Sequence, residues 1–116
     1  MIELPTILGV HRDGDDCTVT VLIRRDLAFL VGHFPGHPVV PGAVQVGWAL
    51  TLAAQYLGTP AACRDMEALK FQRLLLPGQQ VTLSLRFDHA RNKLHFSWLD
   101  GATAYSSGRL VLEQPA

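Results

Sequence analysis

The chain has 116 residues, with 10 basic and 10 acidic side chains and a formal net charge of zero. This length suits one domain with a single core, and the lack of a basic excess argues against binding nucleic acid through its phosphates. Cys17 and Cys63 are too few and too far apart for a disulfide framework or a zinc site. Charges and polar residues interrupt every apolar stretch before the ~18 residues that a membrane span needs, and the first residues lack the pattern of a secretion signal. We therefore expect a single cytoplasmic domain over residues 1–116, with no membrane span and no metal.

The first elements lead to an unusual loop. Residues 17–25 are rich in β-branched and aliphatic side chains and predict a strand, whereas 26–31 is ambiguous and compatible with a short helical turn. Residues 32–43 then concentrate prolines and glycines around His33 and His37. Proline fixes φ and glycine admits conformations closed to other residues, so we expect a stiff, individually shaped loop. Such a loop can hold a histidine beside the unpaired N–H groups of a helix start.

A long apolar helix is predicted over residues 42–57. Apolar residues recur there at helical spacing, Pro41 suits the first turn, and Gly58 and Pro60 mark the end. The segment contains no charged residue. We therefore expect both faces of this helix to be covered, as for a buried central helix.

After the helix, apolar and polar residues alternate, which is typical of half-buried strands. Pro77–Gly78 and Asp100–Gly101 have the composition of turns, and Gly108 is a candidate β-bulge. The order of strand, helix and antiparallel strands predicts an α+β fold, in which one antiparallel sheet wraps around one long central helix. We expect the later strands over residues 67–75, 81–88, 94–99 and 102–112.

The segment 33–42, His-Phe-Pro-Gly-His-Pro-Val-Val-Pro-Gly, closely resembles the signature of the 3-hydroxyacyl-acyl-carrier-protein dehydratases of fatty acid synthesis. Residues 69–73 and 76–78 look like the strand and turn that follow the helix in that family. Residues 44–49 look more like the branch associated with aryl polyene pigments. The resemblance implies the hotdog fold, in which two subunits join their sheets and form two active sites at their interface.

The resemblance also implies roles for individual residues. The histidine matching His33 is the catalytic base, and the backbone N–H matching Gly42 holds the thioester carbonyl. An acid on the helix of the other subunit lies fourteen residues after the histidine in the family, but this position is Gly47 here, so the carboxylate is absent. The substrate is carried on the phosphopantetheine of acyl carrier protein, and no other cofactor is implied. The residues expected to contact substrate are Phe34, Pro41, Gly47 and Trp48.

The chemistry of these residue types agrees with those roles. Dehydration of a 3-hydroxyacyl thioester needs a base for the proton next to the carbonyl and an acid for the departing hydroxyl. Imidazole titrates near neutrality and suits the first task, while N–H donors at a helix start stabilise the charge on the carbonyl oxygen. His37 does not match a catalytic position, and Trp48 suits either an acyl tunnel or the core.

The glycine at position 47 leaves three explanations open. It admits a substrate or a partner helix close to the backbone, or the acid was lost together with the activity, or His33 carries out both proton transfers. Asp65 and Glu67 are the nearest carboxylates after the helix, but both fall near an expected strand start, where surface charges are common.

These observations give one leading function and two alternatives. The leading hypothesis is a dehydratase that converts a 3-hydroxyacyl-acyl-carrier-protein thioester to the trans-2-enoyl thioester, in fatty acid or aryl polyene biosynthesis. The first alternative is a catalytically impaired protein that binds acyl chains or joins an active homologue in a hetero-oligomer. The second is a hotdog thioesterase, which also generally needs a carboxylate near the helix. We expect acyl carrier protein as a partner and a homodimer or higher oligomer.

Overall fold

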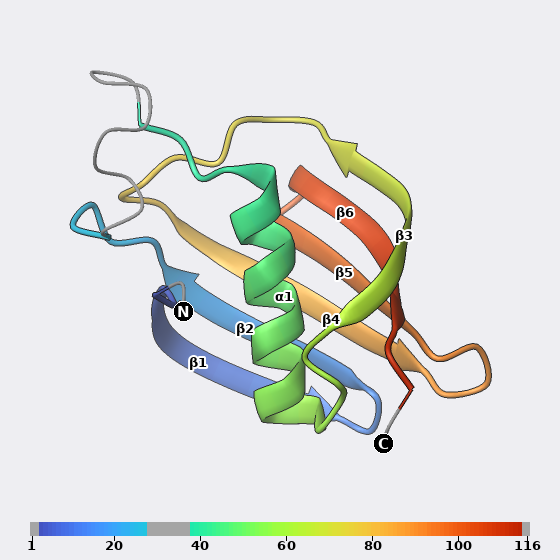
Figure 1. The fold of residues 1–116 in the computed structure, drawn as a ribbon. Helices are drawn as coiled ribbons and strands as arrows, with labels where there is room; N and C mark the ends of the chain where they lie inside the picture. The colour runs from blue at the N-terminus through green and yellow to red at the C-terminus, as the bar shows by residue number, and fades with distance from the viewer. Residues whose placement is uncertain (1–2, 28–37, 115–116) are drawn as a thin grey trace.

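The structure is a computed structural model that describes residues 3–27 and 38–114. In the described residues, one helix lies against one face of a six-stranded antiparallel sheet (Figure 1). The strand order is β1-β2-β4-β5-β6-β3, so β1 and β3 form the two edges. This arrangement confirms the expected α+β architecture. The elements are β1 (Thr6–Asp13), β2 (Asp16–Leu22), α1 (Gly42–Leu57), β3 (Cys63–Phe71), β4 (Gln80–Asp88), β5 (Lys93–Asp100) and β6 (Thr103–Leu112).

The central strands follow the alternation read from the sequence. Every second side chain points toward α1 and is buried, and the residues between them face outward. Leu83 of β4 lies opposite Val19 of β2 on one side and Trp98 of β5 on the other. This register brings the apolar residues of three strands onto one face. The inward-facing residues of these strands are Cys17, Val19, Val21, Val81, Leu83, Leu85, Leu94, Phe96 and Trp98.

Helix α1 has the bounds expected from the sequence. It begins after Pro41, which has extended backbone angles, and ends at Gly58, whose φ of 73° lies in the left-handed region and whose N–H donates to the carbonyl of Ala54 at 3.2 Å. A left-handed residue at this position ends a helix with little strain only when it is glycine. Eight of the 16 helical residues are buried.

The helix is not covered all round within one subunit. Ala43, Thr51 and Gln55 are exposed and Gly47 is half-buried, and the spacing of four residues places them along one stripe. The described residues of this chain therefore do not meet the expectation that both faces are covered.

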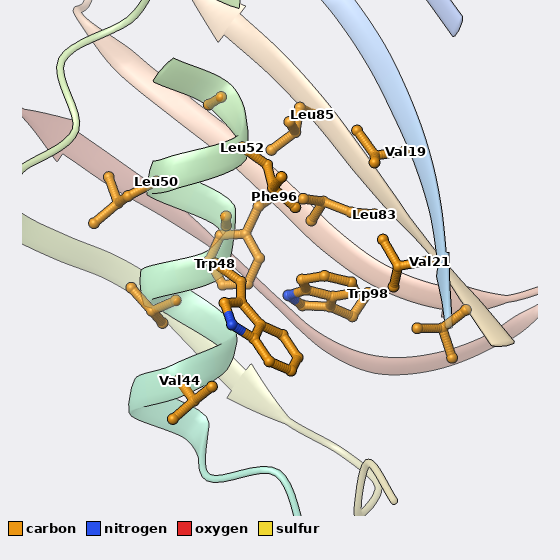
Figure 2. Packing of buried hydrophobic residues seen from close by; sticks show 14 of the residues in the cluster. Val19, Val21, Val44, Trp48, Leu50, Leu52, Leu83, Leu85, Phe96 and Trp98 are labelled. Atoms are coloured by element: carbon orange, nitrogen blue, oxygen red, sulfur yellow. The ribbon is translucent and has the colours of Figure 1, made fainter. Parts of the chain in front are cut away.

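Two tryptophans lie at the centre of the core, between α1 and the sheet (Figure 2). The rings of Trp48 and Trp98 meet edge to face, with centroids 5.9 Å apart. Both indole N–H groups donate to backbone carbonyls, Trp48 to Glu3 at 2.8 Å and Trp98 to Gln45 at 3.1 Å. Burying a large apolar side chain contributes about 1.5–3 kcal/mol, so this cluster fixes the helix on the sheet.

Several boundaries differ from those expected. The edge strand β1 was not predicted, because most of it is exposed and it lacks alternation. Strand β2 ends at Leu22 rather than at residue 25, and β3 begins at Cys63 and ends at Phe71 rather than covering 67–75. Of the ambiguous segment 26–31, only the first two residues lie in the described part: Asp26 is in a turn, and Leu27 has no regular structure.

The bulge expected at Gly108 lies on the neighbouring strand. Gly108 pairs regularly with Phe96 of β5, whereas β3 has one extra residue between Glu67 and Lys70, opposite Gly108. Ala68 in this bulge has a φ of 51°. A Cβ on Gly108 would lie 2.6 Å from Cδ2 of Leu69, so the glycine makes room for the bulged strand. Further irregularities lie between Cys63 and Asp65 of β3, between Ile7 and Gly9 of β1, and in the pairing of β5 with β6.

In the part of the chain that the structure describes, no helix is both long and apolar enough to cross a bilayer.

Candidate active site

The start of α1 leaves backbone donors free. Pro41, which precedes the helix, has φ −60° and ψ 149° and provides no side-chain cap. Its carbonyl accepts hydrogen bonds from the N–H groups of Val44 and Gln45 at 3.0 and 3.1 Å. No described residue supplies an acceptor to the N–H of Gly42. Free N–H groups and the positive end of the helix dipole together favour an oxygen that carries negative charge.

An apolar hollow of about 270 Å³ opens beside these donors. Three of its residues belong to the first turns of α1 and three to the edge strand β3. The N–H of Gly42 therefore lies next to a surface that suits a hydrocarbon chain. The lining residues are Gly42, Ala43, Val46, Met66, Leu69 and Phe71.

The bulge in β3 shapes this hollow. Met66 pairs with Leu110 and Phe71 pairs with Ser106, both of which are buried, inward-facing residues of β6. Met66 and Phe71 are five positions apart, so in a regular strand they would face opposite sides of the sheet. The single extra residue at the bulge brings both to the inner side. The sequence pattern did not reveal these residues, because a bulge interrupts the alternation by which strand faces are assigned.

Gly42 is needed for a close contact with Phe71. A Cβ on residue 42 would lie 2.8 Å from Cε1 and from Cζ of the Phe71 ring, which is closer than carbon atoms approach without strain. The sequence analysis selected Gly42 for its N–H alone. The structure adds that the missing side chain lets the aromatic ring lie against the helix start.

Gly47 has a different environment. It lies one turn beyond Ala43 on the same helix face, and a Cβ there would meet no described residue within 4 Å. The packing of the described residues therefore does not require a glycine at position 47. Of the three explanations for the absent carboxylate, close approach by a substrate or a partner chain is the one that needs a small residue here.

The two carboxylates that follow the helix most closely in sequence, Asp65 and Glu67, both accept hydrogen bonds. Glu67 accepts hydrogen bonds from Lys93 at 2.8 Å and Arg109 at 3.2 Å. These bonds, the one from Lys93 foremost, lower the pKa of the Glu67 carboxyl below its ordinary value, which opposes proton donation near neutrality. Asp65 is exposed, and its carboxylate accepts the N–H of Met66 at 2.8 Å.

The other predicted site residues fall into two groups. His33 and Phe34, together with the less favoured His37, lie outside the described residues. Trp48 is 1% exposed and belongs to the core, which favours a packing role for it over a place in an acyl tunnel. Pro41 is not among the residues that line the hollow, but it directly precedes Gly42, which is.

A larger hollow of about 610 Å³ lies elsewhere and has a different character. Its lining is mostly charged and includes Arg86, Asp88 and Arg91. His89 belongs to it and is bonded to Asp15 at 2.8 Å. Such a surface does not suit an acyl chain. The described residues contain no group of three or more potential metal ligands.

Comparison with known proteins places the chain in a family. A family model described as ApeI-like, ApeI dehydratase, matches residues 10–109. The chain is 35% identical over 93 residues to a 3-hydroxyacyl-[acyl-carrier-protein] dehydratase FabZ of Syntrophobacter fumaroxidans, covering 73% of this chain and 61% of the relative. A FabZ of Oenococcus oeni is 30% identical over 95 residues, covering 72% and 68%. The chain thus spans from somewhat less than half to about two thirds of the length of the curated relatives it matches.

Solved structures give the same result. The dehydratase heterocomplex ApeI:P from Xenorhabdus doucetiae matches with a TM-score of 0.82 at 25% identity, covering 93% of this chain and 96% of the other. An uncharacterized protein from Erwinia carotovora matches with a TM-score of 0.75 at 29% identity, covering 93% and 94%. The family model matches most of the chain, and the sheet with its single helix matches the solved dehydratase structure. The chain therefore belongs to the ApeI-like dehydratase family and has the hotdog fold.

Proposed function

We propose that this protein dehydrates a 3-hydroxyacyl thioester carried on the phosphopantetheine of acyl carrier protein, in the cytoplasm. One observation carries the proposal: Gly42, whose N–H has no acceptor among the described residues, lines an apolar hollow, in a chain of a dehydratase family. The donor suits the thioester oxygen, and the hollow suits the hydrocarbon next to it. The protein needs no further cofactor for this reaction.

The reaction requires two proton transfers. His33 removes the proton from the carbon next to the thioester carbonyl, and negative charge develops on the carbonyl oxygen, where the N–H of Gly42 stabilises it. The electron pair then forms the carbon–carbon double bond, and the hydroxyl on the neighbouring carbon leaves. The leaving hydroxyl takes a proton and departs as water. Because Gly47 supplies no acid, His33 returns the proton that it removed.

The reverse reaction provides the test. Purified protein is assayed for hydration of an enoyl thioester, followed by the loss of enoyl absorbance. We expect activity in the wild type and a loss of about 10²–10⁴-fold in His33→Ala, with a much smaller effect in His37→Ala. Equal losses in the two variants would show that His33 is not the base. Release of free thiol without hydration would indicate a thioesterase instead.

We propose further that the chain forms a homodimer through β3. Five of the seven large hydrophobic residues that are exposed in the described structure fall between residues 66 and 76, on or next to this edge strand. Within the described ranges, one edge of β3 has no strand beside it, and an unpaired apolar edge readily pairs with another chain. A second copy along β3 would also cover the exposed stripe of α1.

A second candidate function rests on Gly47 and on one structural relative. That relative is described as a dehydratase heterocomplex, ApeI:P. In this candidate, the chain is a subunit without its own activity that completes the site of a homologous dehydratase. The hydration assay separates the two: protein that is inactive alone but raises the activity of an added homologous dehydratase would support the second candidate.

A further inference from the structure

A buried amide lies directly behind the start of α1. The side chain of Gln45 is 3% exposed and is surrounded by the apolar core. Its Nε2 donates to the carbonyl of Val40 at 3.0 Å, and its Oε1 accepts the hydroxyl of Ser106 at 2.6 Å. A buried amide is tolerated only when it is hydrogen-bonded, so these two bonds define where this side chain lies.

Val40 is held from two sides. Its carbonyl accepts the amide of Gln45, and its N–H donates to the carbonyl of Leu75, in the connection between β3 and β4, at 2.8 Å. Val40 is separated from Gly42 by Pro41 alone, and proline restricts φ. The direction of the Gly42 N–H therefore depends closely on how Val40 is fixed.

The partner of the Gln45 amide oxygen, Ser106, is also fixed in place. Ser106 is fully buried on β6 and lies opposite Trp98 of β5 in the sheet. The indole N–H of Trp98 donates to the backbone carbonyl of Gln45 at 3.1 Å. The amide thus connects the rigid centre of the sheet to the last residues of the loop that enters the helix.

We propose that Gln45 is a positioning residue for the reaction, which sets the direction of the Gly42 N–H by holding the Val40 carbonyl against the sheet. The inference rests on the proposed function. Oxyanion donors contribute through pre-organised geometry, and a misplacement of about 1 Å can reduce the rate about 10²-fold. An apolar side chain of the same size would fill the same space without fixing Val40.

The first test separates positioning from folding. Gln45→Met preserves the length of the side chain but removes both bonds, and we expect kcat to fall by about tenfold or more with KM nearly unchanged. Gln45→Leu also removes both bonds and places a branched apolar side chain in the same part of the core, so it decides the question if the methionine variant does not fold. A folded variant of either kind with the kcat of the wild type would overturn the proposal.

Thr59 provides a matched control at the opposite end of α1. Its hydroxyl is buried and has no hydrogen-bond partner among the described residues, so Thr59→Val also replaces a buried polar group by an apolar one. We expect this variant to have the kcat of the wild type. A fall equal to that of Gln45→Met would mean that kcat follows general damage to the core, which contradicts a positioning role.

The second test does not depend on activity. Hydrogen exchange of the Val40 amide, measured by NMR, should be about tenfold faster in Gln45→Met than in the wild type and unchanged in Thr59→Val. Unchanged exchange at Val40 would overturn the proposal. A wild type without hydration activity would contradict the proposed function, and the exchange measurement would then decide by itself whether Gln45 fixes the loop.

Discussion

Gly42 and Gly47 lie on the first two turns of the same helix, yet the structure gives them different environments. A side chain at position 42 would collide with the ring of Phe71, whereas a side chain at position 47 would meet no described residue of the subunit. The first glycine is explained by the packing of this chain. The contacts of the described residues do not explain the second, which is consistent with close approach by a substrate or a partner chain.

Substitutions at Gly47 test that explanation directly. If an acyl chain or a partner helix passes close to the backbone there, Gly47→Glu and Gly47→Gln both lower turnover, because both fill the same space. If position 47 is a lost acid, the glutamate variant alone gains about 10²–10⁴-fold. We expect the shared loss, measured by enoyl thioester hydration.

A third variant, Gly47→Ala, separates activity from folding. Alanine favours the helix over glycine, so we expect the free energy of unfolding to rise by about 0.5–1 kcal/mol. A loss of activity in this variant would therefore not reflect unfolding.

The contact between Gly42 and Phe71 gives another prediction. In Gly42→Ala the added methyl group displaces the aromatic ring, so we expect weaker binding of the acyl thioester and a rise in KM. Combining Gly42→Ala with Phe71→Leu removes the clash and should restore most of the loss. Steady-state kinetics of the two single variants and the double variant measure this coupling, and purely additive effects would show that the contact is unimportant.

At the scale of elements, an ion-pair cluster on the outer face of the sheet joins β3 to the adjacent strand β6 and to the next strand, β5. Glu67 of β3 bonds Lys93 of β5 and Arg109 of β6. Both partners lower the pKa of the Glu67 carboxyl below its ordinary value of 4.5. A carboxyl with a lowered folded-state pKa stabilises the protein above its unfolded pKa, and this contribution is lost as the pH falls through the folded pKa.

Glu67→Gln should therefore destabilise the protein at pH 7 and have a smaller effect at pH 3. The effect at pH 7 is expected to be modest, because the cluster is partly exposed to solvent. Urea denaturation at both pH values provides the measurement. Glu113→Gln is the control, since Glu113 forms no ion pair in the described structure, and the two variants should differ at pH 7. A Glu67→Gln effect that is equal at both pH values would contradict the role of the cluster.

At the scale of the whole molecule, β1 and β3 are both sheet edges, but they differ in what surrounds them. Exposed hydrophobic residues concentrate on and after β3, including Leu74 at 71% exposure, whereas β1 exposes Leu8 and Val10. Only β3 borders the hollow beside the helix start. An interface at this edge would therefore place a second copy against the candidate site.

Assembly can be tested by introducing one charged residue near each edge of the sheet, just after β3 or on β1. Leu74→Glu should shift the protein from dimer toward monomer at micromolar concentration and lower its activity, because a buried unpaired charge opposes association. Leu8→Glu places the same charge on the other edge and should leave the dimer intact. Light scattering measures both. A wild type that is monomeric, or an equal effect of the two substitutions, would place the interface elsewhere or exclude it.

The sequence by itself determined the helix and the central strands, because both follow local periodicities: uncharged apolar residues at helical spacing over 42–57 and alternation in β4 and β5. The periodicities are properties of residue order and need no contacts to be found. The attention to Gly42 and to the carboxylate missing at Gly47 came from the resemblance of the loop segment to the dehydratase family.

Only the tertiary structure decided how the site is lined. The bulge in β3 turns Met66 and Phe71 to the same side, against the alternation, and the contact of Phe71 with Gly42 joins segments that are far apart in sequence. The hydrogen bonds of Gln45 to Val40 and Ser106 likewise connect three separate elements. Periodicity describes which face of an element is apolar, but strand register and long-range contacts decide which residues meet. The lining of the hollow and its supporting bonds therefore emerge only when the chain is folded.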